Sequence, residues 1–527
     1  DNNNDRRAAL SIKLLKSTLT VGSMTLLSRI FGLLRDITLA TVFGVSGGTD
    51  AFLIAFKIPN FMRRLFDEGA FSQAFVPVFS EYKEKHSREA LRDLVDHVAG
   101  ALGSVLLLIT LLGSLASPLL VYLFAPGFWD EPTRFQLTAD MLRITFPYLF
   151  FIALVAFAGG IFNSYNKFAV PAFTPVILNL CLIGAAIWLS PLFDIPLMAL
   201  AWGVAVAGLL QLLLQFPSLL KLKLFPIPRL QRRHEGVSKI LRLMLPAVIG
   251  SSVAQINLLL DTIIASFLMV GSVTWLYYSD RMLEFPLGVL GIAIATVILP
   301  ALSQQHANES RDSFNATLDW ALKLVVLISL PACIGLLILA GPILVTLFQH
   351  GGFSANDAYM ASLSLMAYVL GLPAFILIKV LAPGYYSRQD TKTPVKIAIT
   401  AMISNMALNI LFVVPLVMLQ YQAPHVGLAL ATSCSGYVNA VLLYRGLRRA
   451  DVYRPLPGWG GMTVKMLFAL FTMRAIVFYL QPDLELWTWL TALERVLFLG
   501  GIIGLAAAVY LAMLWISGIK PERMKRR

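Results

Sequence analysis

Charged residues are scarce in this sequence. Asp, Glu, Lys and Arg make up 13% of its 527 residues, about half the share found in soluble domains. Hydrophobic residues make up 58%, and apolar runs of about 18 or more residues recur along the chain. This pattern predicts an all-α polytopic membrane protein. A β-barrel is disfavoured because its strands would alternate in polarity, whereas these runs are continuous.

Residues that do chemistry are also rare. Each of the three cysteines, Cys181, Cys333 and Cys434, stands alone in an apolar run, so no disulfide or metal spacing is present. The six histidines are scattered in loops or near span ends. A membrane enzyme should instead cluster catalytic carboxylates or histidines in a loop. The sequence has no Walker A motif, which argues against ATP hydrolysis within this chain.

The apolar runs predict fourteen transmembrane helices. Their expected ranges are about 15–41, 50–80, 94–124, 137–162, 170–190, 195–219, 238–269, 274–301, 315–348, 358–386, 394–417, 424–444, 464–481 and 491–516. Several exceed the roughly 20 residues that a bilayer requires. We therefore expect tilted or kinked helices, with prolines inside them as the bending points.

The basic residues are distributed unevenly between the connections. The connections after even-numbered spans, together with both termini, hold 28 of the 42 Lys and Arg residues, whereas the odd-numbered connections hold only Arg134. The positive-inside rule then predicts that both termini are cytoplasmic. The net charge of +13 is thereby explained without a nucleic-acid partner.

Two pairs of segments suggest an internal repeat. "GAFSQAFVPVFSEY" (69–82) matches "GIAIATVILPALSQQ" (291–305), and "GIFNSYNKFAVP" (160–171) matches "GYYSRQDTKTP" (384–394), each pair six spans apart. Parallel repeats of this kind are typical of transporters. The predicted organisation is a tail (1–14), a six-helix lobe (15–220), a basic linker (221–237), a second lobe (238–444), a second basic linker (445–463), two further helices (464–517) and a basic tail (518–527).

Charged residues inside the first two spans need an explanation, because a charge at the bilayer centre costs roughly 2.5–3.5 kcal/mol. Positions 50, 57, 64 and 68 fall on one face of a helix, so a polar stripe is expected there. The charged residues of these two spans are Arg29, Arg35, Asp36, Asp50, Lys57, Arg63, Arg64, Asp67 and Glu68.

A second charged group lies in the eighth span, where Tyr277, Asp280, Arg281 and Glu284 share one helix face, and Lys379 is a further cation in the tenth. One interpretation is that neighbouring charges form ion pairs that lock helices together. The other is a cationic cavity for a multiply charged anion. Guanidinium groups bind phosphate oxygens in bidentate fashion and keep their charge when desolvated.

Four stretches carry a resemblance to a known family. They are "SRIFGLLRD" (28–36), "TDAFLIAFKIPNFMRRLFDEGAFSQAFVPVFSEYK" (49–83), "YYSDRMLEFPLGVLG" (277–291) and "KVLAPGYYSRQDTKTPVKIA" (379–398). The sequence resembles the MurJ (MviN) lipid II flippases of the multidrug/oligosaccharidyl-lipid/polysaccharide exporter superfamily. The resemblance covers the chain after about residue 13.

The resemblance implies a multi-pass protein of the bacterial inner membrane, with a given fold and activity. It implies fourteen helices, with two six-helix lobes around a central cationic cavity and a lipid-tail groove at the last two helices. The activity it implies is transfer of lipid II, the undecaprenyl-pyrophosphate-linked peptidoglycan precursor, from the cytoplasmic to the periplasmic leaflet by alternating access. The family's cavity arginines fall on Arg29, Arg35, Arg63 and Arg281, and its acidic residue at the head of the second helix falls on Asp50. Asp36, Lys57, Arg64 and Glu68 belong to the same motif stretches and rank lower.

The resemblance says less about the driving force of transport and about the binding partners. No cofactor is expected, and ion coupling or the membrane potential would supply energy. Some family members bind sodium through an aspartate in the seventh helix, which here is Asp261, with Asn405, Asn409 and Thr432 as matching oxygen donors. The alternative is a hydrogen bond between helices. Lipid II and membrane lipids are the expected partners of a monomer, with pathway contacts to peptidoglycan-synthesis enzymes.

Two other transporter classes remain open. A flippase for another polyprenyl-pyrophosphate oligosaccharide would need the same cations. A drug/cation antiporter of the same superfamily should instead offer acids and aromatic residues. A purely scaffolding protein would not need buried arginines.

Overall fold

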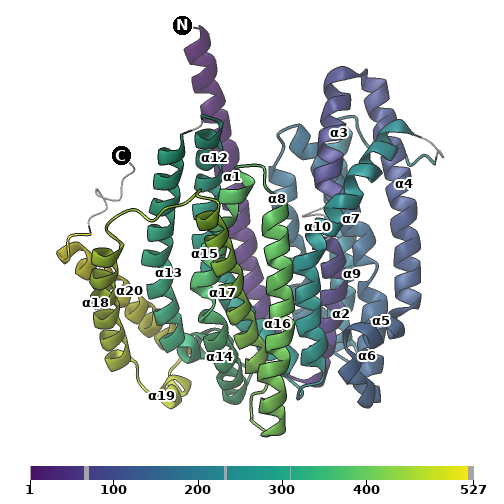
Figure 1. Ribbon diagram of the computed structural model, residues 1–527. Helices are drawn as coiled ribbons and strands as arrows, with labels where there is room; N and C mark the ends of the chain where they lie inside the picture. Colours follow the sequence, from purple (N-terminus) through teal and green to yellow (C-terminus); the bar gives the residue numbers. More distant parts are fainter. Residues whose placement is uncertain (1, 65–70, 231–233, 309, 520–527) are drawn as a thin grey trace. The chain divides into compact units, whose positions relative to one another are not determined.

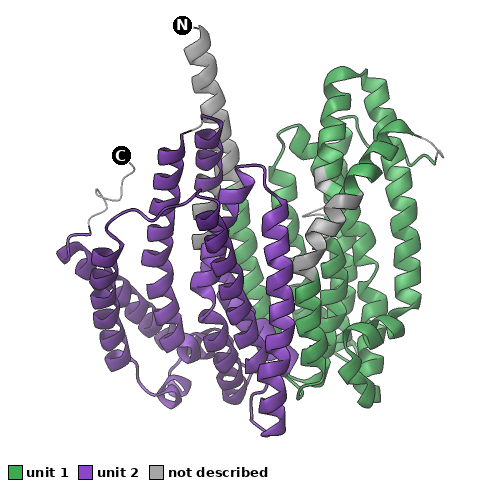
Figure 2. Cartoon of the chain, viewed as in Figure 1, with its two compact units in different colours: residues 1–271 green, residues 272–527 purple. Residues whose placement is uncertain are grey.

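The computed structural model describes residues 2–64, 71–230, 234–308 and 310–519, and within them every regular element is a helix (Figure 1). The chain divides into two compact units, residues 1–271 and 272–527 (Figure 2). The all-helical fold agrees with the sequence prediction, because long apolar segments satisfy their backbone hydrogen bonds internally only as helices.

The first unit contains ten α-helices and three short turns of other helix types among its described residues. These are α1 (Asn2–Phe43), α2 (Gly47–Arg64), α3 (Phe71–Lys85), α4 (Arg88–Leu115), α5 (Ser117–Phe124), η2 (Pro126–Asp130), α6 (Pro132–Thr145), α7 (Tyr148–Ser164), α8 (Ala169–Gly184), η3 (Ala185–Leu189), η4 (Ser190–Leu192), α9 (Met198–Lys221) and α10 (Glu235–Ser266).

The described residues of the second unit form ten α-helices and one π-helical turn. These are α11 (Ser272–Pro286), η5 (Leu287–Gly291), α12 (Ile292–Ala307), α13 (Arg311–Phe348), α14 (Ala355–Val369), α15 (Leu372–Tyr386), α16 (Lys392–Met418), α17 (Val426–Arg449), α18 (Trp459–Leu480), α19 (Leu484–Trp489) and α20 (Ala492–Ile516).

Several predicted spans are interrupted at or beside a proline. The fourth span is divided into α6 and α7 next to Pro147, and the tenth into α14 and α15 next to Pro373. In the eighth span Pro286 ends α11 and a π-helical turn follows. Proline lacks the N–H that would continue the helical hydrogen-bond ladder, which explains these positions. Pro59 and Pro331, by contrast, lie inside α2 and α13.

Ten helices or helix pairs in the described residues are long and apolar enough to cross a membrane by length and composition. They match ten of the fourteen predicted spans. The other four ranges, 15–41, 50–80, 238–269 and 274–301, also contain helices. Three of these four carry the charge clusters, and the fourth carries Asp261. The multi-pass fold is therefore confirmed, and the count of fourteen stays a prediction.

The unit boundary does not coincide with the predicted linker at 221–237. Helix α10 was predicted to open the second lobe, yet it groups with the first unit, where it packs against α3, α4 and α5. Phe71 and Phe75 of α3 and Phe157 of α7 are in mutual ring contact, and Ile240 of α10 belongs to the same buried core. The predicted lobe boundaries stay a prediction.

Large apolar side chains are exposed on several helices, as expected where lipid replaces water as the neighbour. On α4 they include Leu108, Leu111 and Leu112, and on α16 Ile410 and Leu411. Within the second unit, α13 packs against both α18 and α20. The two final long helices are therefore attached to the second unit through α13.

Candidate functional site

Helix α1 carries two predicted arginines in different surroundings. Arg35 is buried and donates from Nε and Nη2 to Asp36 at 2.9 and 2.7 Å, and from Nη1 to Asn179 of α8 at 3.0 Å. Arg29 is half-buried, and no hydrogen bond or ion pair to another described residue is found for its side chain. Arg35 therefore ties α1 to α8, whereas Arg29 has no such tie among the described residues.

Asp50 lies in the first turn of α2 and is completely buried. Its Oδ2 accepts from Nη2 of Arg134 at 2.6 Å and from the backbone N–H of Gly271 at 2.7 Å. Arg134 also lies over the ring of Phe128, 3.7 Å from its centre. This buried ion pair joins α2, α6 and the turn after α10. A helix-locking role is thus visible for Asp50, whose predicted contact with substrate the structure leaves untested.

The remaining cations of α2 are half-buried. They are Lys57, Arg63 and Arg64. Nε of Arg63 donates to Asn60 at 2.8 Å, and Nε of Arg64 is buried without a hydrogen-bond partner in the described structure. Positions 50, 57 and 64 lie on one helix, as predicted. Asp67 and Glu68 lie outside the described residues, so the end of the polar stripe stays a prediction.

Helix α11 presents the charged group of the second unit. Nη1 of Arg281 donates to Glu284 at 2.8 Å, and its guanidinium lies 5.4 Å from the centre of the Tyr277 ring. The two charged side chains are 33% and 42% exposed, and exposed ion pairs contribute little stability. The Arg281–Glu284 pair therefore contributes little to stability, and the predicted contact of Arg281 with substrate stays a prediction. Lys379 on α15 is exposed.

The predicted cation ligands belong to different units. Asp261 is half-buried on α10 of the first unit. Asn405 and Asn409 are buried, one turn apart, on α16 of the second unit. Thr432 on α17 donates its hydroxyl to the carbonyl of Leu428 at 3.0 Å. The two asparagines thus share a face, and a site that includes Asp261 stays a prediction.

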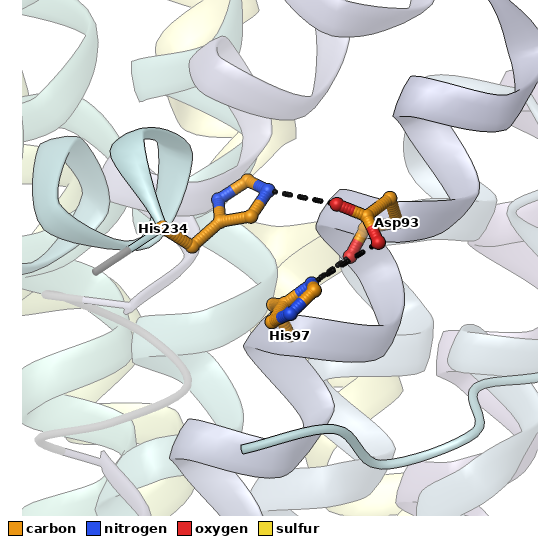
Figure 3. Close-up of side chains that lie close together, drawn as sticks. All are labelled: Asp93, His97 and His234. Atoms are coloured by element: carbon orange, nitrogen blue, oxygen red, sulfur yellow. Dashed lines mark hydrogen bonds and ion pairs between the residues drawn. The ribbon is translucent and has the colours of Figure 1, made fainter. Parts of the chain in front are cut away.

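Asp93, His97 and His234 form a second polar cluster (Figure 3). Asp93 and His97 lie one turn apart on α4, and His234 is the N-cap of α10. Nδ1 of His97 is 3.4 Å from Oδ1 of Asp93, and Nε2 of His234 is 3.3 Å from Oδ2. The scattered histidines of the sequence therefore include two that the fold brings together.

This cluster contains residue types that bind metal ions, but the orientation of its rings does not suit coordination of one ion. The two imidazole rings stack, with centres 4.8 Å apart and planes 26° apart, so their in-plane lone pairs run side by side. Nδ1 of His234 also accepts from the N–H groups of Gly236 and Val237 at 3.1 and 3.4 Å. The ring proton must then sit on Nε2, facing Asp93. Burial and the neighbouring His97 hold the pKa of His234 below its ordinary value of 6.5.

Sequence reasoning missed three groups that the fold uses. Arg134 was assigned to a connection, yet it is buried in α6 as the partner of Asp50. Asn179 was not singled out, because one amide in an apolar span gives no local signal of its distant partner. Asp96 and Asp319 are buried acids near the beginnings of α4 and α13, and each follows a Ser-Arg-acid triplet (87–89 and 310–312) that could have been found.

Comparisons with known proteins agree on one family. The family model described as "Lipid II flippase MurJ" matches residues 39–498. A Haemophilus influenzae protein named "Probable lipid II flippase MurJ" is 48% identical over 95% of this chain and 99% of its own. A Burkholderia cenocepacia protein named "Lipid II flippase MurJ" is 40% identical over 98% of this chain and all of its own.

Solved structures give the same answer for the fold. The structure titled "Lipid II flippase MurJ, inward closed conformation" matches with a TM-score of 0.78 at 29% identity, over 94% of this chain and 98% of that one. An inward-facing multidrug transporter of the MATE family in the MOP superfamily matches with a TM-score of 0.66 at 12% identity, over 82% of this chain and 98% of that one, which concerns the fold alone. This chain belongs to the lipid II flippase MurJ family.

Proposed function

We propose that this protein is a lipid II flippase, a transporter that carries the lipid-linked precursor between membrane leaflets by alternating access. The relatives with that name match this chain over almost their full length. The observation that carries the proposal further is Arg29, a half-buried guanidinium without a partner among the described residues. A charge inside a membrane is energetically costly, and one without a compensating carboxylate is expected to serve a ligand or a transport pathway.

The proposed ligand for these cations is the pyrophosphate group. Arg29, Arg63 and Arg64 of the first unit and Arg281 of the second would bind its oxygens, since guanidinium groups replace the water that a phosphate loses. Arg35 has a supporting role in this proposal, because Asp36 and Asn179 already occupy its donors.

The polyprenyl tail needs an apolar path while the headgroup crosses. Helices α18 and α20 pack against each other and expose large apolar side chains, among them Phe468 and Phe471 on α18 and Leu493 and Leu497 on α20. We assign the tail to this helix pair. The headgroup then remains with the arginines while the tail stays in a lipid-like environment.

The energy source in this proposal is a monovalent cation gradient or the membrane potential. Asp261 would supply the carboxylate of a sodium site, and Asn405, Asn409 and Thr432 would supply neutral oxygens. Hard cations prefer such oxygen donors. Coupling would arise if the cation bound one state of the transport cycle more tightly than another.

A flippase for another polyprenyl-pyrophosphate oligosaccharide is the second candidate, because the arginines would read only the pyrophosphate. A substrate panel separates the two. Vesicles containing the protein are supplied with lipid II, with undecaprenyl pyrophosphate carrying a different oligosaccharide, or with a lipophilic cation. We expect transfer of lipid II. Equal transfer of both pyrophosphates would favour the broader substrate class.

The decisive variants are Arg29→Ala and Arg29→Lys. Losing charge-assisted hydrogen bonds worth about 1.5–3 kcal/mol should lower lipid II transfer roughly ten- to hundredfold, and Lys should restore part of it. Arg143→Ala is the matched control, since Arg143 is exposed and pairs with exposed Asp140. Thermal stability in detergent should stay unchanged for all three. Normal transfer by Arg29→Ala would contradict the assignment.

A further inference from the structure

Two buried aspartates occupy the same place in two corresponding helices. Asp96 lies eight positions beyond the first residue of α4, Arg88, and Asp319 lies eight positions beyond the first residue of α13, Arg311. Each side chain is 1% exposed. The local sequences, "SREALRDLVDH" (87–97) and "SRDSFNATLDW" (310–320), match at Ser, Arg, the acid and the aspartate. The third and ninth predicted spans therefore share this feature.

Each aspartate binds the segment that leaves its six-helix lobe. The backbone N–H of Ile227 donates to Oδ1 of Asp96 at 2.8 Å, and that of Leu456 donates to Oδ1 of Asp319 at 3.1 Å. Both donors stand between two prolines, in "PIP" (226–228) and "PLP" (455–457). Proline has no N–H and keeps the preceding residue extended. Each tripeptide therefore presents one N–H group, and a buried carboxylate accepts it.

Further contacts hold each segment against its helix. At α4 the N–H of Arg229 donates to the backbone carbonyl of Asp96 at 3.0 Å, and a Cβ added to Gly100 would lie 2.1 Å from the Arg229 carbonyl oxygen. At α13 the side chain of Asn315 both donates to and accepts from the backbone of Arg454, at 2.9 and 2.7 Å. The bound segments are thus in direct backbone contact with the helices.

The contacts also position the helix that follows. Asp319 accepts from the indole N–H of Trp459, the first residue of α18, at 2.8 Å. It also accepts from the Tyr453 hydroxyl at 2.7 Å and pairs with Lys323 at 2.8 Å. In the first unit, the bound segment leads to His234, the N-cap of α10, which contacts Asp93 one turn before Asp96.

We propose that Asp96 and Asp319 are equivalent positioning residues, each of which fastens the chain leaving a lobe and so makes the next helix move with that lobe. Helix α10 then moves with the first unit, and α18 moves with the second. Residues 226–230 and 453–457 of the basic linkers are fixed straps rather than hinges. The functional consequence rests on the proposed flippase activity, because the tail-binding helices α18 and α20 would follow the second unit through the transport cycle.

The test begins with Asp319→Ala and Asp96→Ala in the full-length protein. Hydrogen exchange should rise at least tenfold in residues 453–465 for the first variant and in residues 226–240 for the second. Asp451→Asn is the control, because Asp451 lies on the same linker as an exposed partner of Arg454. Unchanged exchange in both aspartate variants would overturn the proposal. If an aspartate variant fails to fold, Leu456→Pro removes the donated N–H while leaving Asp319 in place and should raise exchange in residues 453–465 in the same way.

Transport then separates positioning from simple stability. Asp319→Ala should lower the lipid II transfer rate at least fivefold at unchanged lipid II binding. A disulfide between Asn315→Cys and Arg454→Cys, in a background without the native cysteines, should restore at least half of the rate. Failure of the closed disulfide to restore transfer would overturn the positioning role. If the unmodified protein transfers no lipid II, the proposed function fails, and the exchange experiment still decides whether the straps exist.

Discussion

At the residue scale, burial divides the charged side chains into two classes. Arg35 and Arg134 are each paired with a buried carboxylate, and removing one partner of such a pair leaves an uncompensated charge. Arg29 has no such pair among the described residues. The first class holds helices together, and the second is the class that a ligand would complete. The ion-pair interpretation of the intramembrane charges therefore holds for Arg35 and Arg134, and the ligand-binding interpretation of Arg29 stays a prediction.

Part of this division was predictable. Arg35 precedes Asp36 directly, so their pairing follows from the sequence. The third contact of Arg35 comes from Asn179, 144 positions further on, and no local pattern announces it. Asp50 was recognised as unusual, but its partner Arg134 is 84 positions away. Sequence reasoning thus found charges that need partners, while the partners themselves depended on tertiary packing.

His234 should make the beginning of α10 sensitive to acid. Its neutral Nδ1 accepts two backbone N–H groups, and its folded pKa lies below the ordinary 6.5. When the first turn of α10 is open, His234 has its ordinary pKa and binds a proton as the pH falls below 6.5. The folded cap binds that proton only at lower pH, so the stability of the cap decreases as the pH falls from 6.5 to the folded pKa. The charged and titratable side chains around the imidazole are Tyr82, Asp93, His97 and Glu235.

We expect amide protection over residues 235–239 to be lower at pH 5.5 than at pH 7.5, after correction for intrinsic exchange rates. Hydrogen exchange measured by mass spectrometry reports this directly. His234→Asn keeps an oxygen that can cap the helix at either pH, so it should abolish the difference. An equal pH effect in His234→Asn would assign the titration to another group of the cluster.

At the element scale, apolar runs predicted where helices lie better than where they break. The span expected over 137–162 corresponds to α6 and α7, and that over 358–386 to α14 and α15. Both breaks lie beside a proline, so composition indicated them. Pro59 and Pro331 show why the rule is incomplete, since each lies inside an uninterrupted helix. Whether a proline bends or ends a helix depends on the packing around it.

Gly100 and Gly103 provide a matched pair of changes on α4. A Cβ at Gly100 would lie 2.1 Å from the carbonyl oxygen of Arg229, whereas one at Gly103 would meet nothing within 4 Å. Gly100→Ala should therefore displace the strap and raise hydrogen exchange in residues 226–234. Gly103→Ala should leave exchange unchanged and stabilise the helix by up to about 1 kcal/mol. Equal exchange in both variants would show that the strap does not contact α4 in solution.

At the scale of the whole molecule, the sequence predicted a duplicated architecture, and the structure divides the chain into two units. The predicted boundary was drawn at the basic linker, because loop composition changes there. Contacts divide the chain later, after Gly271, since α10 packs on α3 and α4. A linker that is rich in charge resembles a flexible connection in composition, but the backbone N–H of Ile227 in this one donates a hydrogen bond to Asp96.

The proposed cation site would couple an ion gradient to transport. A cation that binds one conformational state more tightly than another favours that state, which is how a gradient can drive a cycle. Asp261→Asn keeps the size of the side chain and removes its charge, so it should abolish any dependence of lipid II transfer on the sodium gradient.

The measurement compares transfer in vesicles with sodium outside, sodium inside or potassium on both sides, at a clamped membrane potential. We expect the unmodified protein to respond to the gradient and Asp261→Asn to lose that response, while Asp140→Asn, an exposed acid, keeps it. If the membrane potential drives transport instead, the clamped potential would set the transfer rate of all three proteins, and none of them would respond to the sodium gradient. If Asp261→Asn keeps the full sodium response, Asp261 is a hydrogen-bonding residue between helices, and the driving ion must bind elsewhere.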